Sequence, residues 1–372
     1  MKITVARPYA ITMWDFSWLE RRWPGAGYEN WDQALDELAD RGYDAVRIDA
    51  FPHLVSADPD KFWEILPTWN QTSWGAQSLT RVRVMPELET FLVKARDRTM
   101  KVGLSTWWRQ DRDDVRMQIR SPGDLARVWS DTIRHVKDAG LLDAILYVDF
   151  SNEFPIPFWT PFLYGSIEGQ EKSRKSPEVL AYMREAVALL RREFPTLPYT
   201  FSFCTQYRDW PEQDVSMLDF LEPHIWMSHP ETSDYNEKVG YHFEKFSPQG
   251  FDNLVKRGFT VYRDNRVVYD KRLTDEIENV AAWSRKSGRA LITTECWSLV
   301  DYKDWPLLDW GWIKDLCALG VEHAAGTGRW IAMATSNFCG PQFVGMWRDV
   351  AWHRRLTDMI KSAPVDMDLR SP

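Results

Sequence analysis

Residues 144–155 read Ala-Ile-Leu-Tyr-Val-Asp-Phe-Ser-Asn-Glu-Phe-Pro, and this stretch decides the fold prediction. The apolar, β-branched run at 145–150 is typical of a strand that is buried on both faces. It stops at three polar residues that end with Glu153, and Pro155 follows. The stretch therefore predicts a buried strand that carries a glutamate at its C-terminal end.

A second stretch has the same form. Residues 290–297 read Ala-Leu-Ile-Thr-Thr-Glu-Cys-Trp, a short β-rich run with Glu295 near its end. Hydrolysis of a glycosidic bond needs two carboxyl groups, because one attacks the sugar or activates water while the other protonates the leaving oxygen. Glu153 and Glu295 are therefore candidates for such a pair.

Short apolar strands and amphipathic helices alternate along the whole chain. Helix starts are indicated by Asn30, Ser121-Pro122, Ser176-Pro177 and Thr274, which are residues typical of N-caps and first helical turns. We predict strands at 8–14, 43–51, 101–108, 144–150, 199–204, 223–227, 290–294 and within 323–334. We predict helices at 30–42, 86–98, from 121 onward, at 176–194, from 274 onward, at 310–319 and at 343–360.

This alternation favours one closed (β/α)8 TIM barrel over residues 1–372, a fold of eight strands and eight helices. An open doubly wound sheet is disfavoured because no Gly-x-Gly-x-x-Gly follows a strand, and the P-loop pattern is absent as well. Two long βα loops, 155–176 and 229–272, are rich in aromatic residues. We interpret 229–272 as a lid or rim insertion that carries short helices.

The composition of the chain argues against some classes of binding partner. The formal net charge is −8 and the sequence pI is about 5.5, whereas nucleic-acid binding depends on basic patches. No stretch approaches the roughly 18 apolar residues of a membrane span, and the first residues have no apolar leader. Four widely spaced cysteines in a chain of 372 residues indicate free thiols in a reducing compartment. We expect no nucleic-acid or membrane partner and a cytoplasmic location.

Tryptophan is unusually abundant, with 21 residues. Aromatic rings pack against the apolar faces of sugars, but they also fill protein cores. In a barrel, functional groups lie at the C-terminal ends of the strands. That rule selects the candidates Arg47, Trp107, Trp108, Asn152, Glu153, His224, Trp226, Glu295 and Trp330, to which we add Trp297 beside Glu295.

With these residues the chain resembles the clan A glycoside hydrolases, in particular cellulase-like enzymes near family 5. In that clan an Arg follows strand two, an Asn-Glu pair ends strand four, His-x-Tyr lies at strand six, a Glu ends strand seven and a Trp often accompanies strand eight. The corresponding residues are Arg47, Asn152-Glu153, His224-Ile225-Trp226, Glu295 and Trp330. Two departures stand out, because Trp107-Trp108 replaces a frequent His and Trp226 replaces the Tyr.

The resemblance implies a retaining mechanism with two carboxyl groups about 5–5.5 Å apart. Glu295 would be the nucleophile, held ionised by Arg47. Glu153 would be the acid/base, which calls for a raised pKa. Asn152 would bind the sugar 2-OH, and the other candidates would line the substrate site. We expect a β-glycosidase that acts on short oligosaccharides or small glycosides, without cofactor or metal.

Other interpretations stay open. Glu153 could cap a helix, Glu295 and Arg47 could form a structural ion pair, and His224 could bond a backbone carbonyl in the core. The same site could serve a transglycosidase, or the barrel could be a non-catalytic carbohydrate-binding protein. His224, His229 and His242 match no zinc spacing, and a Gly-x-Ser-x-Gly elbow is absent. The sequence indicates neither the sugar nor the oligomeric state.

Overall fold

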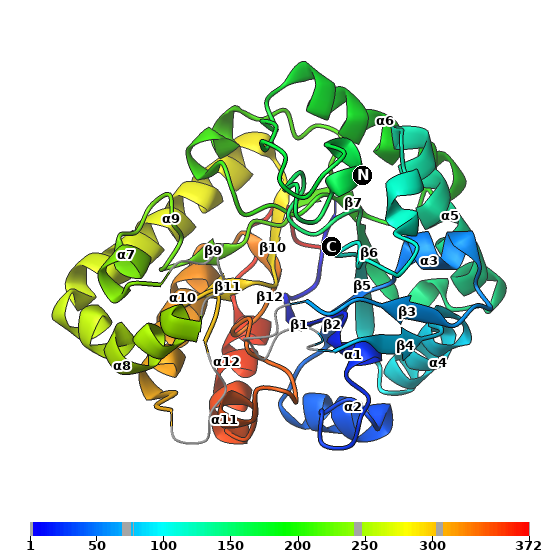
Figure 1. The fold of residues 1–372 in the computed structure, drawn as a ribbon. Coiled ribbons are helices and arrows are strands. Elements are labelled where there is room, and N and C mark those ends of the chain that lie inside the picture. The colour runs from blue at the N-terminus through cyan, green and yellow to red at the C-terminus, as the bar shows by residue number, and fades with distance from the viewer. Residues whose placement is uncertain (1–2, 69–75, 77, 242–247, 303–307, 372) are drawn as a thin grey trace.

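The computed structural model describes residues 3–68, 76, 78–241, 248–302 and 308–371. Eight parallel strands form one central sheet with helices around it (Figure 1). The order across the sheet is β7 (Tyr199–Thr200), β6 (Ile145–Asp149), β5 (Lys101–Ser105), β2 (Ala45–Asp49), β1 (Tyr9–Asp15), β12 (Trp330–Met333), β10 (Ala290–Thr293) and β8 (Phe220–Leu221).

The two edge strands of this sheet meet. The Thr200 hydroxyl donates to the Phe220 carbonyl at 3.0 Å, and the Asp219 N–H donates to the Tyr199 carbonyl at 2.9 Å. The sheet therefore closes on itself, and the predicted (β/α)8 barrel is confirmed.

Amphipathic helices cover the outside of the barrel and bury their apolar faces against it. The predicted starts at Asn30, Ser121 and Ser176 are confirmed, since each side chain accepts a backbone N–H of the first turn. No helix of the described residues is both long and apolar enough to cross a membrane. The main helices are α2 (Trp31–Asp40), α4 (Val84–Asp97), α5 (Pro122–Asp138), α6 (Pro177–Glu193), α9 (Arg266–Ser287), α10 (Gly311–Gly326) and α12 (Val350–Ser362), and shorter ones are α1 (Ser17–Glu20), α3 (Pro52–Ala57) and α11 (Val344–Trp347).

The predicted sixth strand at 223–227 is wrong in its bounds. The barrel strand β8 ends at Leu221, and Pro223, which has no N–H to donate, interrupts the run. A second short strand, β9 (Ile225–Trp226), then pairs with β11 (Cys296–Trp297) in a small separate sheet. The strict alternation of strands and helices also fails here, because only the 3-10 helix η4 (Tyr207–Glu212) joins β7 to β8.

We expected the segment 229–272 to carry short helices, but one of its helices is long. The segment holds α7 (Tyr235–Val239) and the 17-residue α8 (Pro248–Asp264), and α9 begins at Arg266 rather than at Thr274. The Thr274 hydroxyl donates to the Lys271 carbonyl within that helix. His242, Phe243 and Phe246 lie outside the described residues, and the role of the segment as a lid stays a prediction.

The β2–α4 connection and the last repeat also differ from the prediction. An antiparallel hairpin of β3 (Trp63–Ile65) and β4 (Thr80–Val82) is inserted between β2 and α4. Helix α10 continues to Gly326, so β12 begins only at Trp330. The prediction that Trp330 lies at the C-terminal end of a strand is therefore wrong, because it opens β12.

The interior of the barrel has two layers. Near the N-terminal ends of the strands the side chains form an apolar cluster, which we call the apolar layer: Ile11, Ala45, Tyr147, Phe220, Ala290, Ile292, Ile331, Ala332 and Leu369. Toward the C-terminal ends lies a set of buried polar side chains, which we call the polar layer: Arg47, Ser105, Asp149, Ser202, Glu222 and Thr294. All four cysteines are buried and free.

Candidate active site

The polar layer is organised by Arg47, whose side chain is fully buried. Its Nη2 donates to Asp149 Oδ2 and to Asn152 Oδ1, both at 2.7 Å. Its Nη1 donates to Glu295 Oε1 at 3.2 Å and to the Thr294 hydroxyl at 2.9 Å. The guanidinium also lies 4.6 Å from the centre of the Trp107 ring. A planar, five-donor group can make all these bonds at once, which a lysine could not.

Glu153 follows β6 in a left-handed backbone conformation, with φ of 49°. Such a conformation costs a non-glycine residue about 1–2 kcal/mol, so the surroundings must hold it. Its N–H donates to the Ser202 hydroxyl at 3.0 Å, and the next N–H, from Phe154, donates to the Ser202 carbonyl at 2.8 Å. The loop after β7 thus fixes where the Glu153 carboxyl group points.

His224 connects the two glutamates. Its Nδ1 lies 2.9 Å from Glu153 Oε1 and 3.8 Å from Glu295 Oε2, and its Nε2 lies 3.5 Å from Arg47 Nη1. Because a guanidinium can only donate, Nε2 must accept, and the ring proton is therefore on Nδ1, where it is donated to Glu153. Burial lowers the pKa of His224, in agreement with a neutral ring. His224 bonds a carboxylate, not the backbone carbonyl that the alternative interpretation required.

Glu295 lies between β10 and β11. Its carbonyl accepts the Ile225 N–H at 3.2 Å, so the pairing of β9 with β11 fixes Glu295 beside His224. Burial and the negative charge of Glu153 raise the pKa of Glu295 well above its ordinary value, although Arg47 opposes this. Burial also acts to raise the pKa of Glu153, but hydrogen bonds from His224 and from Trp159 Nε1, at 3.0 Å, outweigh it and lower that pKa.

These directions differ from the expected ones, in which Arg47 holds Glu295 ionised and Glu153 has the raised pKa. The physical reason is that burial and the negative charge of Glu153 act on Glu295 more strongly than the opposing charge of Arg47, which also contacts Asp149 and Glu222. Glu153 in turn receives two N–H donors. Without substrate, the shared proton of the pair therefore favours Glu295.

The two carboxyl groups are close together. One oxygen of each glutamate and a ring nitrogen of His224 all lie within 4.8 Å of one another. Three such ligand atoms could approach a divalent cation. The positive charge of Arg47, in hydrogen-bond contact with Glu295, opposes a cation at this position.

Two buried donors near the carboxyl groups bond no atom of the described residues. Asn152 has its Oδ1 held by Arg47, which leaves Nδ2 unpaired, and the indole Nε1 of Trp226 is likewise unpaired. Unsatisfied buried N–H groups are costly, so a bound ligand with hydroxyl oxygens would relieve them.

The other predicted tryptophans serve packing. Trp108, Trp297 and Trp330 are at most 1% exposed, and each indole N–H donates inside the protein, to Ser151 Oγ, the Ala334 carbonyl and Thr293 Oγ1 respectively. Trp107, also buried, covers the Arg47 guanidinium. The structure therefore brings together Arg47, Asn152, Glu153, His224, Trp226 and Glu295, and it places these four tryptophans in the packing around them.

Sequence reasoning missed the polar residues beneath the two glutamates. Asp149 and Glu222 each contact Arg47, and Ser105, Ser202 and Thr294 bond to these charged groups. A signal was available, because side chains at i and i+2 in a strand share a face. Glu222 lies two residues before His224, and it could have been found by that spacing.

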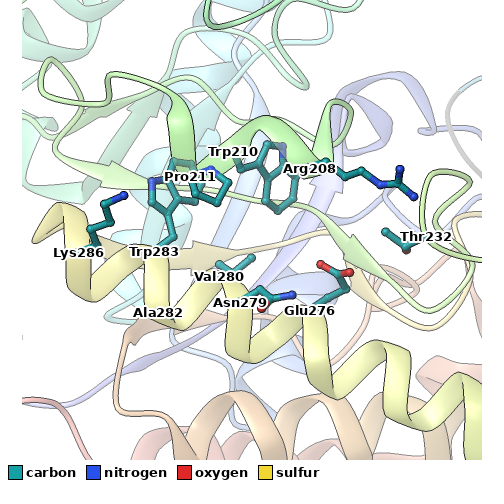
Figure 2. A pocket seen from close by; sticks show the side chains of 10 residues that line it. All are labelled: Arg208, Trp210, Pro211, Thr232, Glu276, Asn279, Val280, Ala282, Trp283 and Lys286. Atoms are coloured by element: carbon teal, nitrogen blue, oxygen red, sulfur yellow. The ribbon is translucent and has the colours of Figure 1, made fainter.

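A separate groove lies away from the two glutamates. Figure 2 shows it between η4, the loop at Thr232 and α9, and its lining includes Trp210, Trp283, Glu276, Asn279 and Lys286. Its volume is about 580 Å³. It contains none of the predicted site residues, and the two tryptophans are only 2% and 4% exposed, so it offers little aromatic surface to a sugar.

Comparison with known proteins identifies a family and a structural relative that is similar over nearly the whole chain. Residues 11–361 match the family model described as "Cellulase-like: Sugar-binding cellulase-like". A candidate glycoside hydrolase from Parabacteroides distasonis is 49% identical, with 98% of this chain and 96% of that one covered and a TM-score of 0.94. The sequence has no significant match among curated proteins.

More distant structures share the fold. An endo-1,4-β-D-mannanase from Thermotoga petrophila is 12% identical, with 88% and 87% of the chains covered and a TM-score of 0.54. A family 5 mannosidase from Rhizomucor miehei is 9% identical, with 95% and 93% covered and a TM-score of 0.56. At these identities the likeness concerns the barrel alone.

Proposed function

This chain belongs to the cellulase-like family, and from that premise we propose that it is a retaining β-glycosidase that uses Glu295 as nucleophile and Glu153 as acid/base. The observation that carries the proposal is the distance between the two carboxyl groups, with oxygens within 4.8 Å. Retaining enzymes hold the two groups about 5–5.5 Å apart, whereas inverting enzymes need about 6.5–9.5 Å to admit a water molecule.

In the first step, the Glu295 carboxylate attacks the anomeric carbon while Glu153 protonates the departing oxygen. Arg47 supports the attack because it donates to Glu295 Oε1 and so orients that carboxyl group. In the second step, Glu153 takes a proton from water, and the water oxygen displaces Glu295 from the sugar. Both steps need only these two carboxyl groups and the proton they share.

The proton must lie on Glu153 when the bond breaks, although the free site favours Glu295. A sugar seated over the pair excludes water and brings the leaving oxygen to Glu153, so a proton on Glu153 gains a hydrogen-bond acceptor. The anion on Glu295 in turn faces the partial positive charge that develops at the anomeric carbon. We infer that substrate binding shifts the shared proton across a gap of less than 4.8 Å.

Asn152 and Trp226 supply orientation. The unpaired Asn152 Nδ2 is fixed by the bond of its Oδ1 to Arg47, so it can donate to a sugar hydroxyl oxygen next to the anomeric centre. Trp226 Nε1 can donate to a second oxygen. An indole cannot pass on a hydroxyl proton, as a tyrosine in its place could, so Trp226 binds without taking part in proton transfer.

The substrates we propose are short oligosaccharides or small glycosides. The loop after β6 folds back through the 3-10 helix η3 (Pro161–Leu163), and its Trp159 donates directly to Glu153. A loop anchored on the acid/base encloses that side of the site. Random internal cleavage of a long glucan or mannan would contradict this substrate class.

The roles of the two glutamates can be tested by azide rescue with aryl β-glycosides of several sugars. The variant Glu153→Ala should regain turnover with azide and release a β-glycosyl azide, because the glycosyl-enzyme on Glu295 still forms. The variant Glu295→Ala should give the α-glycosyl azide instead. A control, Glu171→Ala, removes a nearby half-buried carboxyl group and should show no azide dependence. If Glu153→Ala gave the α-azide and Glu295→Ala gave the β-azide, the roles of the two glutamates would be reversed. Transfer of the sugar to an acceptor without hydrolysis would favour a transglycosidase.

A further inference from the structure

Arg47 is the one cation in contact with three buried carboxyl groups of the described site. Besides Asp149 at 2.7 Å and Glu295 at 3.2 Å, Glu222 Oε1 lies 3.6 Å from Arg47 Nε. Arg47, Asp149 and Glu222 have fully buried side chains. One positive charge cannot compensate three negative charges away from water, so at least one carboxyl group must hold a proton.

Glu222 is connected to Glu295 through the Thr294 hydroxyl and Arg47 Nη1. Thr294 Oγ1 donates to Glu222 Oε1 at 2.7 Å and accepts from Arg47 Nη1 at 2.9 Å. The same Nη1 donates to Glu295 Oε1 at 3.2 Å. A change of charge on Glu222 therefore acts on the bond that Arg47 makes to Glu295.

We propose that Glu222 is a positioning residue for the nucleophile, which divides the charge of Arg47 with Glu295 and so shifts the balance of the shared proton between the two catalytic carboxyl groups. The inference rests on the proposed function, because it takes Glu295 as the nucleophile. Glu222 touches no reacting atom, since it lies beneath Arg47 in the polar layer.

The direction of the effect follows from the charges around it. Burial raises the pKa of Glu222 to about 7, against the opposing charge of Arg47, so near neutral pH both of its forms are populated. Ionised Glu222 acts to raise the pKa of Glu295, and neutral Glu222 leaves more of the Arg47 charge to Glu295. The neutral form thus moves the shared proton toward Glu153. The titratable and charged groups that face Glu222 or Glu295 are Arg47, Tyr147, Asp149, Glu153, His224 and, at longer range, Asp15.

The test is a carbon NMR titration of protein labelled with δ-13C-glutamate, in which each carboxyl carbon reports its own ionisation. The Glu295 signal is identified by its loss in Glu295→Gln. In Glu222→Gln, which keeps the shape but not the charge, we expect the Glu295 midpoint to fall by about one pH unit, a tenfold change in its ionisation constant. The matched control is Asp301→Asn, another buried carboxyl group with a pKa of about 7, which bonds Tyr241 instead. It should leave the Glu295 midpoint in place.

An unchanged Glu295 midpoint in folded Glu222→Gln, or an equal shift in Asp301→Asn, would overturn the inference. A purely structural role would lower the melting temperature without moving the midpoint. If Glu222→Gln does not fold, Thr294→Val removes the hydroxyl that connects Glu222 to Arg47. It should lower the Glu295 midpoint, because Glu222 loses a donor that stabilises its anion and Arg47 Nη1 is left to Glu295; an unmoved Glu295 midpoint would overturn the inference too. These readouts need no substrate, so a failure of the proposed glycosidase function would appear separately, as the absence of cleavage and of azide rescue.

Discussion

The two layers of the barrel interior are built by the same strands and hold opposite kinds of side chain. In β2 and β6, Ala45 and Tyr147 belong to the apolar layer, and two residues further on stand Arg47 and Asp149. In β8, Phe220 is followed in the same way by Glu222, which lies just past the end of the strand. Since residues i and i+2 of a strand share a face, one step of about 6.5 Å along each strand changes the interior from apolar to ionic.

The difference separates stability from chemistry. Burying the apolar layer contributes about 25 cal/mol for each Å² removed from water. Burying ions in the polar layer costs free energy that only their mutual bonds offset. Tyr147 joins the layers, since its ring packs on Phe220 at 5.0 Å while its hydroxyl lies 3.4 Å from Glu222. The apolar layer thus supports a charged layer that could not stabilise the fold by itself.

Removal of Arg47 should have the largest effect of the changes considered. A small effect would contradict the comparison between the apolar layer and the polar layer. Arg47→Met leaves Asp149, Glu222 and Glu295 without their cation, so the free energy of unfolding should fall by about 3–5 kcal/mol, and glycosidase activity should be lost. Urea unfolding measures the change. The control in the apolar layer, Ile331→Val, should cost about 0.5–1.5 kcal/mol and keep activity. Equal losses in the two layers would mean that they do not differ as described.

A substitution that crowds the apolar layer should affect stability more than chemistry. A Cβ added at Gly103 would lie 2.6 Å from the Tyr147 ring, which is too close for any real contact. Gly103→Ala should therefore lower the free energy of unfolding by about 1–3 kcal/mol through overpacking. The crowded atoms include the Tyr147 hydroxyl, which faces Glu222, so any shift of a midpoint in the pH–rate profile should be smaller than in Glu222→Gln. A larger shift would show that the layers are coupled more tightly than the contacts indicate.

The buried acids predict how stability depends on pH. Burial raises the pKa of Asp15, Asp49, Glu222 and Asp301 to about 7, so the folded chain holds these protons to higher pH than the unfolded chain does. The stability that these protonated groups contribute is complete below about pH 4, which is near the ordinary pKa of Asp and Glu. It is lost as the pH rises through 7. We expect the melting temperature to fall from pH 6 to pH 8.

Asp301→Asn should make this fall less steep, by about 1 kcal/mol of unfolding free energy per pH unit. Calorimetry at several pH values measures it. The buried His53 and His353, whose pKa values burial lowers to about 3, act at the acid end, where unfolding lets them take up protons. A melting temperature that rises from pH 6 to pH 8 would show that the buried acids are ionised in the folded chain.

Trp159→Phe should have the smallest effect and sharpens the account of Glu153. The indole N–H lowers the pKa of Glu153, so its removal should raise that pKa and let the acid form persist to higher pH. We expect the alkaline limb of kcat/KM to move upward by about half a pH unit. Trp330→Phe, which loses an indole N–H bonded to Thr293 instead, is the matched control and should leave that limb in place. A downward shift would contradict the assignment.

The sequence predicted the barrel because a strand buried on both faces gives an apolar run that stops where polar loop residues begin. The runs around Val148 and Ile292 show this, and the glutamates that follow them meet in the structure. The site could be predicted to the extent that strand ends of a parallel barrel converge. Trp330 was misplaced because the preceding helix continued through apolar residues that read equally well as a strand.

The i, i+2 spacing makes Glu222 a candidate, but the sequence does not show that the residues of the polar layer meet at Arg47, for a physical reason. Glu222 follows a barrel strand of only two residues, and Pro223 interrupts the run, so its inward direction depends on pairing with strands far away in the chain. The pKa order of Glu153 and Glu295 likewise depends on burial, on their mutual repulsion and on the donors His224 and Trp159 beside Glu153. These are properties of distances between chain segments, which a motif does not contain.

The most direct test of the central claim is trapping of the covalent intermediate with a panel of 2-deoxy-2-fluoro β-glycosides that carry good leaving groups. The fluorine slows both steps, and the leaving group lets the first proceed. We predict that one sugar adds the mass of a single fluoroglycosyl group and that peptide mapping places it on Glu295. Label on Glu153 or on another residue would contradict the account, as would a protein that hydrolyses a glycoside with inversion and is never labelled.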